Sequence, residues 1–241
     1  MQVLVQRATG FAANLAFPRR CAYCGRILGF ARSCRHCEAA LCELAIGSSA
    51  ELMQEHPFGM LTHITACYRY DSVVKRAVQR MKFKGRRNLA LPFAEEMETA
   101  VRRDFAACAF DFVLPVPSSA AALRHRGYNV PTLIGKSLAA RLDLPFQNDI
   151  LVKEYETRPQ HHLSQAARAA NLIGAFRVEH GADVRGKTIL LVDDLITTGA
   201  TMEECAKMLR LAGARTICGA AYAAANKPTK PALFTWKKAG R

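Results

Sequence analysis

The apolar positions of this chain repeat with two different periods between residue 61 and residue 224. Runs that alternate or stay apolar, rich in β-branched and aromatic residues, predict strands in residues 61–70, 110–116, 175–178, 189–194 and 216–224. Apolar residues that recur every three or four positions predict helices in residues 72–83, 89–101, 132–142 and 200–211. Strands and helices that alternate in this way predict an α/β domain with a mainly parallel sheet and helices on both faces.

The chain outside this pattern predicts two smaller parts. Residues 1–60 combine a short predicted helix, residues 1–17, with a cysteine cluster that has little room for a core of its own. Residues 61–226 hold the α/β pattern, and residues 227–241 form a basic tail without any acidic residue. With 241 residues, 50% of them hydrophobic, the chain has room for one full core and a small appendage.

Lysine and arginine outnumber aspartate and glutamate by 34 to 20, which gives a net charge of +14. A surplus of this size attracts polyanions, so we expect partners that carry phosphate. The basic residues gather in residues 19–35, 75–87 and 227–241, although each cluster alone would also suit a solvated face or an unfolded tail. No apolar run approaches the roughly 18 residues of a membrane helix, so we expect a cytoplasmic protein without membrane insertion.

Five of the nine cysteines lie between Cys21 and Cys42, and this spacing favours a metal site in a reducing cytoplasm over disulfides. Two C-x-x-C pairs are separated by nine residues, and each pair offers two thiolates to one tetrahedral ion. We therefore predict a structural Zn²⁺ site whose ligands are Cys21, Cys24, Cys34 and Cys37. A redox dithiol, the alternative, would have little use for the second pair.

The residues around this cluster complete the prediction of a zinc knuckle. Gly25 and Arg26 suit a tight turn in which backbone amides donate hydrogen bonds to the thiolates. Cys42 could replace one ligand, serve a second site or pack in an apolar core, and we favour packing because no partner pair lies nearby. The same assignment holds for the four isolated cysteines, Cys67, Cys108, Cys205 and Cys218.

The most hydrophobic predicted strand, residues 189–194, ends in Asp193 and Asp194, and the loop after it leads directly into a helix. Ligands bind at such strand ends in parallel sheets. The loop offers hydroxyls and backbone amides to a phosphate through Thr197, Thr198, Gly199, Ala200 and Thr201. The two carboxylates can accept hydrogen bonds from sugar hydroxyls or hold a hydrated Mg²⁺. A phosphate on one side and a diol on the other describe a 5-phosphoribosyl group.

Two other interpretations of this region are weaker. The acidic pair could merely cap a turn while the threonines begin the helix, but that would not explain why both follow a fully apolar strand. Residues 181–188 spell the nucleotide-binding pattern G-x-x-x-x-G-K-T, yet they open a predicted strand, whereas a P-loop must follow a strand and open a helix.

The run LLVDDLITTGAT resembles the motif that binds 5-phosphoribosyl-1-pyrophosphate (PRPP) in type I phosphoribosyltransferases. Together with the cysteine pairs it resembles the ComF/GntX family, the competence-associated phosphoribosyltransferase-like proteins of bacteria. Three further stretches resemble blocks of that family in the same order: YRYDSVVKRAVQRMKFKGRR, VLPVPSSAAALRHRGYNV and RPQHHLSQAARAANLIGAF. Val130 and residues 118–122 depart from the usual pattern of the second block.

The resemblance implies a type I phosphoribosyltransferase-like fold behind a small zinc module, with PRPP bound together with Mg²⁺. Asp193 and Asp194 would fix the ribose, while Arg124 and Arg126 would donate to the pyrophosphate and so form the catalytic set with them. A mobile flap over the site is implied for the third block, with Gln160, His161, His162, Arg168 and Asn171. Lys82 and Lys84 in the first block could contact phosphate or nucleic acid, or only solvent.

Two functions stay open. The family's competence role implies a PRPP-binding protein that acts in DNA uptake and natural transformation, with single-stranded DNA and the uptake machinery as partners. The alternative is an active phosphoribosyltransferase that transfers ribose 5-phosphate from PRPP to a base or amine. We identify no nucleobase-recognition segment after Asp194, which favours the first function. The sequence leaves open which basic cluster binds DNA and how many copies of the chain assemble.

Overall fold

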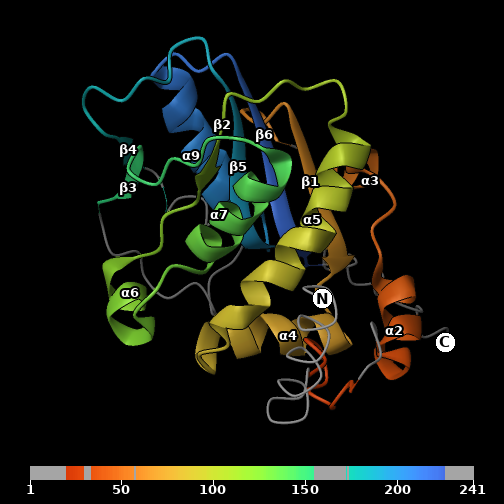
Figure 1. The fold of residues 1–241 in the computed structure, drawn as a ribbon. Coiled ribbons are helices and arrows are strands. Elements are labelled where there is room, and N and C mark those ends of the chain that lie inside the picture. The colour runs from red at the N-terminus through yellow and green to blue at the C-terminus, as the bar shows by residue number, and fades with distance from the viewer. Residues whose placement is uncertain (1–19, 30–33, 57, 155–171, 173, 226–241) are drawn as a thin grey trace, which may run out of the picture.

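The central sheet has four parallel strands in the order β1-β6-β5-β2 (Figure 1). This computed structural model describes residues 20–29, 34–56, 58–154, 172 and 174–225. The strands of the sheet are β1 (His63–Arg69), β2 (Phe112–Pro115), β5 (Thr188–Ile196) and β6 (Thr216–Ala224). A separate antiparallel pair consists of β3 (Leu151–Lys153) and β4 (Phe176–Val178). The predicted parallel sheet is therefore confirmed.

The helices that the periodicity predicts are also present. They are α4 (Ser72–Phe83), α5 (Ala90–Asp104), α7 (Val130–Leu142) and α9 (Ala200–Leu211). The structure adds elements that we did not predict: α2 (Arg35–Leu44), α3 (Ser49–Glu55), α6 (Ala120–Arg126), the 3-10 turn η1 (Arg87–Leu89) and β3. All of these are at most ten residues long and too short to show a clear apolar period.

Each face of the sheet is covered by its own apolar cluster, and β5 shows how the sequence produces both. Leu190 and Val192 point to the cluster beneath α5 and α7, whereas Ile189 and Leu191 point to the cluster that includes α9 and α3. A strand that is buried on both faces must be apolar at every position, which is why this strand has the longest apolar run. Helices therefore cover both faces, as predicted.

The cysteine segment packs onto the α/β domain through the first of these clusters. Cys21, Tyr23 and Cys37 belong to the same buried cluster as the inner faces of α4 and α5. A small segment that cannot bury a core of its own gains stability by sharing a neighbour's core. The division of the chain at residue 60 stays a prediction.

The direction of the strands determines where polar side chains can meet. Because the four strands are parallel, their carboxyl ends lie at one edge of the sheet, the edge toward which the arrowheads point in Figure 1. The predicted helix 1–17, residues 155–171 and the tail 227–241 lie outside the described residues. Among the helices that are described, none is long and apolar enough to cross a membrane.

Candidate functional site at the end of strand β5

Three ionisable side chains meet at the carboxyl end of β5. Lys82, from the last turn of α4, places its Nζ 2.9 Å from Oδ1 of Asp194. Asp193 accepts a hydrogen bond from the backbone amide of Asp194 at 2.8 Å. The side chain of Asp194 is 5% exposed and that of Lys82 is 22% exposed, so the ion pair lies largely out of water. The acidic pair is thus part of a buried charge cluster and does not simply cap a turn.

The cluster has one more acceptor than the described residues satisfy. Oδ2 of Asp194 is buried and accepts no hydrogen bond from any described residue. An unsatisfied buried carboxylate oxygen costs free energy, and such groups are common where a ligand completes the site. A sugar hydroxyl or a hydrated Mg²⁺ has the chemistry to supply the missing contact.

The protonation of Asp193 is set by its surroundings. Burial and then the charge of Asp194 raise the pKa of Asp193 from 3.8 to about 8, although Lys82 opposes the shift. For Lys82, burial by itself would lower the pKa, but the charges of Asp194 and Asp193 raise it above 10.5. The site therefore holds a proton near neutral pH that an arriving cation could displace.

The loop after β5 presents backbone amides to the same edge. Thr198 accepts a weak hydrogen bond of 3.4 Å from the amide of Ala200, the first residue of the twelve-residue helix α9. The amides of Thr197, Thr198 and Gly199 make no hydrogen bond to another described residue. Free amides at the start of a helix, where the helix dipole is positive, form an anion site. Thr201 lies in the first turn of α9, so the five predicted loop residues are contiguous at this edge.

Gly199 has a structural reason for being glycine that the sequence did not reveal. Its φ is +80°, a left-handed conformation that disfavours other residues, and it begins α9. A Cβ at this position would lie 2.3 Å from Cε1 of Phe58. The structure shows that this glycine makes room for the ring of Phe58 behind the loop.

Phe58 is held in place by the first turn of α9. The amides of Gly59 and Met60 each donate a hydrogen bond of 2.7 Å to Oε1 of Glu203. Since Glu203 lies four residues after Gly199, the same helical turn carries the loop and anchors the segment that supports it. The position of the loop thus depends on contacts with residues 58–60.

The two predicted arginines lie on α6, in the connection between β2 and α7. Arg126 lies near enough to Lys82 for its charge to affect the pKa of that amine. Arg124 is exposed at the same helix end and makes no described ion pair. The connection is fixed by Asn129, which donates to the carbonyl of Val116 at 3.0 Å. The predicted flap residues Gln160, His161, His162, Arg168 and Asn171 lie outside the described residues.

The four predicted metal ligands converge in the cysteine segment, which contacts Arg80 of α4. All four Sγ atoms lie within 4.8 Å of one another, with Cys21 and Cys37 3.8 Å apart and Cys24 and Cys34 3.6 Å apart. Ligands about 2.3 Å from a tetrahedral zinc are about 3.8 Å from one another, so the cluster fits one such ion with no position left open. Gly25 has a φ of +79°, as expected for the tight turn.

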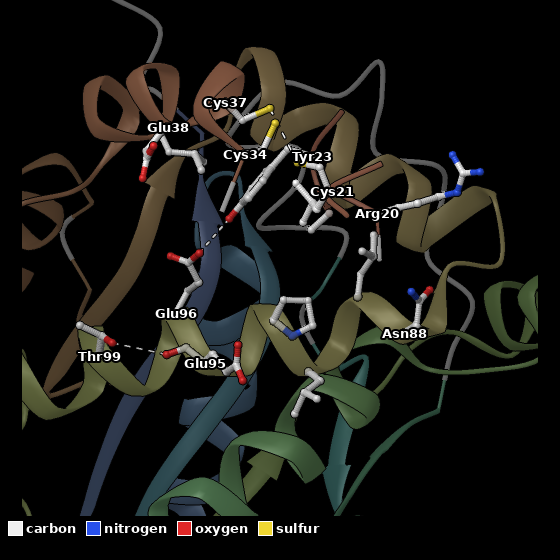
Figure 2. A pocket seen from close by; sticks show the side chains of 16 residues that line it. Arg20, Cys21, Tyr23, Cys34, Cys37, Glu38, Asn88, Glu95, Glu96 and Thr99 are labelled. Carbon is white, nitrogen blue, oxygen red and sulfur yellow. Dashed lines mark hydrogen bonds between the residues drawn. The ribbon is translucent and has the colours of Figure 1, made fainter. Parts of the chain in front are cut away.

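Tyrosine hydroxyls connect this cysteine cluster to the sheet. Tyr23, between the first two cysteines, donates to Oε1 of Glu96 at 3.0 Å (Figure 2). Tyr68 of β1 donates to Oε2 of the same carboxylate. Tyr222 of β6 donates to the hydroxyl of Tyr23 at 2.8 Å, and its ring stacks on Phe93. Burial and the nearby carboxylate of Glu96 raise the pKa of Tyr23, so its phenol stays protonated. A cavity of about 540 Å³ lies beside this network, between the cysteine segment and α5.

One cysteine prediction is wrong. Cys42 is exposed on the outer side of α2 and does not pack in a core. The prediction failed because the helix was not predicted, and therefore its solvent-facing side was unknown. Cys67, Cys205 and Cys218 are buried and Cys108 is half-buried, as predicted for packing residues.

Comparison with known proteins gives one matching domain family and several named relatives. A family profile described as Phosphoribosyl transferase domain matches residues 132–239. The DNA utilization protein YhgH of Salmonella typhi is 32% identical over 151 residues, 61% of this chain and 66% of that protein. Competence protein F of Haemophilus influenzae is 29% identical over 201 residues, 82% of this chain and 86% of that protein. The chain belongs to the ComF family.

The ComF-family chain has a type I phosphoribosyltransferase-like α/β fold, preceded by a four-cysteine cluster that fits a zinc knuckle. This chain aligns with just under two thirds of the length of YhgH from Salmonella typhi. Among solved structures, adenine phosphoribosyltransferase from Saccharomyces cerevisiae is 15% identical, with a TM-score of 0.37, over 57% of this chain and 69% of that chain.

The sequence alone did not decide the role of Lys82, although the spacing of residues along α4 indicates it. In this ComF-family chain Val74, Val78 and Lys82 are spaced by four residues and therefore share one stripe of α4. The first two are buried, so a lysine that continues the stripe should face a buried carboxylate. No comparable signal marked Phe58, because its contact with Gly199 joins segments 141 residues apart.

We predict that Gly199→Ala destabilises the protein by more than its backbone conformation alone requires. The left-handed φ should cost about 1 kcal/mol and the overlap with Phe58 about 1–3 kcal/mol more. Gly181→Ala is the matched control, because Gly181 has a φ of +83° and no atom near the added Cβ. Urea unfolding of both variants measures the difference, and equal losses would show that Phe58 does not constrain the loop.

We predict a pH dependence of stability that is specific to Asp193. The folded state keeps its proton up to about pH 8 while the unfolded chain releases it near pH 4, so this group's contribution to the free energy of unfolding falls between those values. Asp193→Asn should flatten that part of the profile and stabilise the protein by about 1–2 kcal/mol at pH 8.5. Thermal unfolding between pH 5 and 9 tests this, with the exposed Asp149→Asn as control. A variant profile parallel to the wild type would contradict the prediction.

We predict that one zinc ion binds per chain and that its loss affects the whole fold. Cys34→Ser should reduce the zinc content well below one ion per chain. It should also lower the melting temperature, because the knuckle shares its core and tyrosine network with the sheet. Cys42→Ser, an exposed cysteine on the same segment, should retain both. Elemental analysis and thermal unfolding give the two readouts. Full zinc content in Cys34→Ser would rule out the four-cysteine site.

Proposed function

We propose that this protein binds PRPP with Mg²⁺ at the carboxyl end of β5 and acts in the uptake and handling of DNA in the cytoplasm. The observation that carries the proposal is the acidic pair of half-buried Asp193 and buried Asp194, which lies beside the amides of residues 197–199 that bond to no other described residue. The amides can donate hydrogen bonds to a phosphate, and the carboxylates can accept hydrogen bonds from a diol. The two groups lie side by side because the loop joins the end of one strand to the start of the next helix. The names of the relatives, a DNA utilization protein and a competence protein, support the role in DNA handling.

In this proposal each group has a separate role. The amides and hydroxyls of residues 197–201 hold the 5-phosphate, and the two carboxylates accept from the ribose hydroxyls. The unsatisfied Oδ2 of Asp194 is the atom that the sugar or a Mg²⁺-bound water completes. Mg²⁺ supplies charge compensation for the pyrophosphate when bound. Arg124 and Arg126 on α6 extend the positive charge toward the pyrophosphate.

Lys82 gives the ligand-free site an internal counter-charge. Its amine pairs with Asp194 and so reduces the cost of burying two adjacent carboxylates without a ligand. Arrival of Mg²⁺ would compete with this amine for the carboxylate, which leaves the lysine free to contact a ligand phosphate. Zn²⁺ in the four-cysteine cluster has a structural role, because all its positions are filled by thiolates.

The test is PRPP binding by calorimetry in the presence of Mg²⁺. Asp193→Asn with Asp194→Asn should weaken binding at least 30-fold, because about 2–3 kcal/mol of charged hydrogen bonds is lost. Asp149→Asn with Asp183→Asn changes the net charge by the same amount at exposed positions and should leave the affinity for PRPP unchanged. Unchanged PRPP affinity in the first double variant would overturn the site.

A pyrophosphate-release assay separates binding from catalysis. The wild-type protein is incubated with PRPP, Mg²⁺, a panel of bases and single-stranded DNA. We expect binding without turnover in the presence of the bases. Turnover with one base would instead establish the active transferase, the alternative function, at the same site.

A further inference from the structure

An exposed aromatic side chain ends α4 next to the PRPP site. Phe83 is 61% exposed and lies between Lys82, which pairs with Asp194, and Lys84, which is exposed. A single exposed apolar residue is ordinary on protein surfaces. Here the ring stands among cations, and that combination is the pattern of a surface on which nucleic-acid bases stack.

The cations come from two chain segments that the fold brings together. Arg87 places its guanidinium 4.5 Å above the ring of Tyr128, just after α6, and lies 3.5 Å from the Cβ position of Gly127. The hydroxyl of Tyr128 donates to the carbonyl of Met81 in α4. The ends of α4 and α6 therefore adjoin, and both lie at the lower end of the view in Figure 1. We call this region the basic-aromatic surface; it comprises Phe83, Lys84, Arg86, Arg87, Arg124 and Tyr128.

No carboxylate of the described residues forms an ion pair with these exposed cations. Residues 75–94 and 112–142 contain no aspartate or glutamate. Lys84, Arg86, Arg87 and Arg124 make no ion pair with any described carboxylate, whereas other arginines such as Arg69, Arg103 and Arg141 do. Basic residues stabilise helix carboxyl ends, which accounts for some of these positions. It does not account for Arg86 and Arg87, which follow the end of α4, or for the exposed ring.

We propose that the basic-aromatic surface binds single-stranded DNA, with a base stacked on Phe83 and the flanking phosphates on Lys84 and Arg86. A duplex would keep its bases paired and could not use the ring, so the surface fits a single strand. This inference rests on the proposed function, whose nucleic-acid partner it specifies. Because Lys82 and Phe83 are adjacent, the strand would pass beside the PRPP site.

The first test removes the ring. Binding of a fluorescein-labelled oligo(dT) of 20 nucleotides to the zinc-loaded full chain is followed by anisotropy. Phe83→Ala should weaken binding roughly 5- to 100-fold, the range for loss of one stacked base. Leu211→Ala, at an apolar residue that is 73% exposed on α9, is the control and should leave binding unchanged. Equal affinity of Phe83→Ala and wild type would overturn the stacking role.

The second test removes charge. Lys84→Gln with Arg86→Gln should lower the slope of log affinity against log salt by about 1.4, the value for two phosphate contacts on a single strand. Lys136→Gln with Arg185→Gln removes the same charge from exposed positions elsewhere and should preserve the slope. An equal change in both double variants would show only a general charge effect and would overturn the location.

Two further arms identify the partner and separate this inference from the proposed function. Duplex DNA of the same length should bind more weakly than oligo(dT). Equal or tighter duplex binding, or tighter binding of oligo(U), would overturn single-stranded DNA as the partner.

Calorimetry with PRPP should give wild-type affinity for Phe83→Ala and for Lys84→Gln with Arg86→Gln. Loss of DNA binding with PRPP binding intact supports the surface. Normal PRPP binding without any DNA binding by the wild type would overturn the surface alone.

Discussion

Two adjacent carboxylates at the end of a buried strand create the strongest electrostatic constraint in this protein. Asp194 is almost fully buried, and burying an unpaired carboxylate would be prohibitively costly. The fold meets the cost with Lys82 on one oxygen and with a retained proton on Asp193, whose pKa is raised to about 8. One oxygen of Asp194 is still unsatisfied among the described residues. The position of α4, which carries Lys82, is thus tied to the charge at the site.

The same helix links the charge cluster to the cysteine cluster. Its last turn carries Lys82, while Arg80, two residues earlier, donates to the carbonyl of Tyr23 in the cysteine segment at 3.3 Å. Tyr23 in turn reaches β1 and β6 through Glu96 and Tyr222. A metal that orders the cysteine segment therefore also supports the helix that neutralises the acidic pair. In this account the zinc acts on the PRPP site only through packing and hydrogen bonds.

Much of this arrangement is predictable from the sequence, for identifiable reasons. The strand 188–196, the helix 200–211 and the four cysteine ligands are encoded locally, by an apolar run, a helical period and a short spacing. The contact of Phe58 with Gly199 and the pairing of Arg87 with Tyr128 join distant segments and leave no periodic signal. Short elements such as α2 and α6 were missed because one or two turns give too few positions to define a period, and the wrong assignment of Cys42 followed from that.

The central claim is that the acidic pair and the loop after it form one PRPP site, and the structure of the complex tests it most directly. A crystal structure with PRPP and Mg²⁺ should place the 5-phosphate on the amides of residues 197–201 and the ribose hydroxyls on Asp193 and Asp194. Oδ2 of Asp194 should then be satisfied, and Nζ of Lys82 should move away from its 2.9 Å contact with Oδ1. PRPP bound elsewhere, with the pair of Lys82 and Asp194 unchanged, would contradict the account.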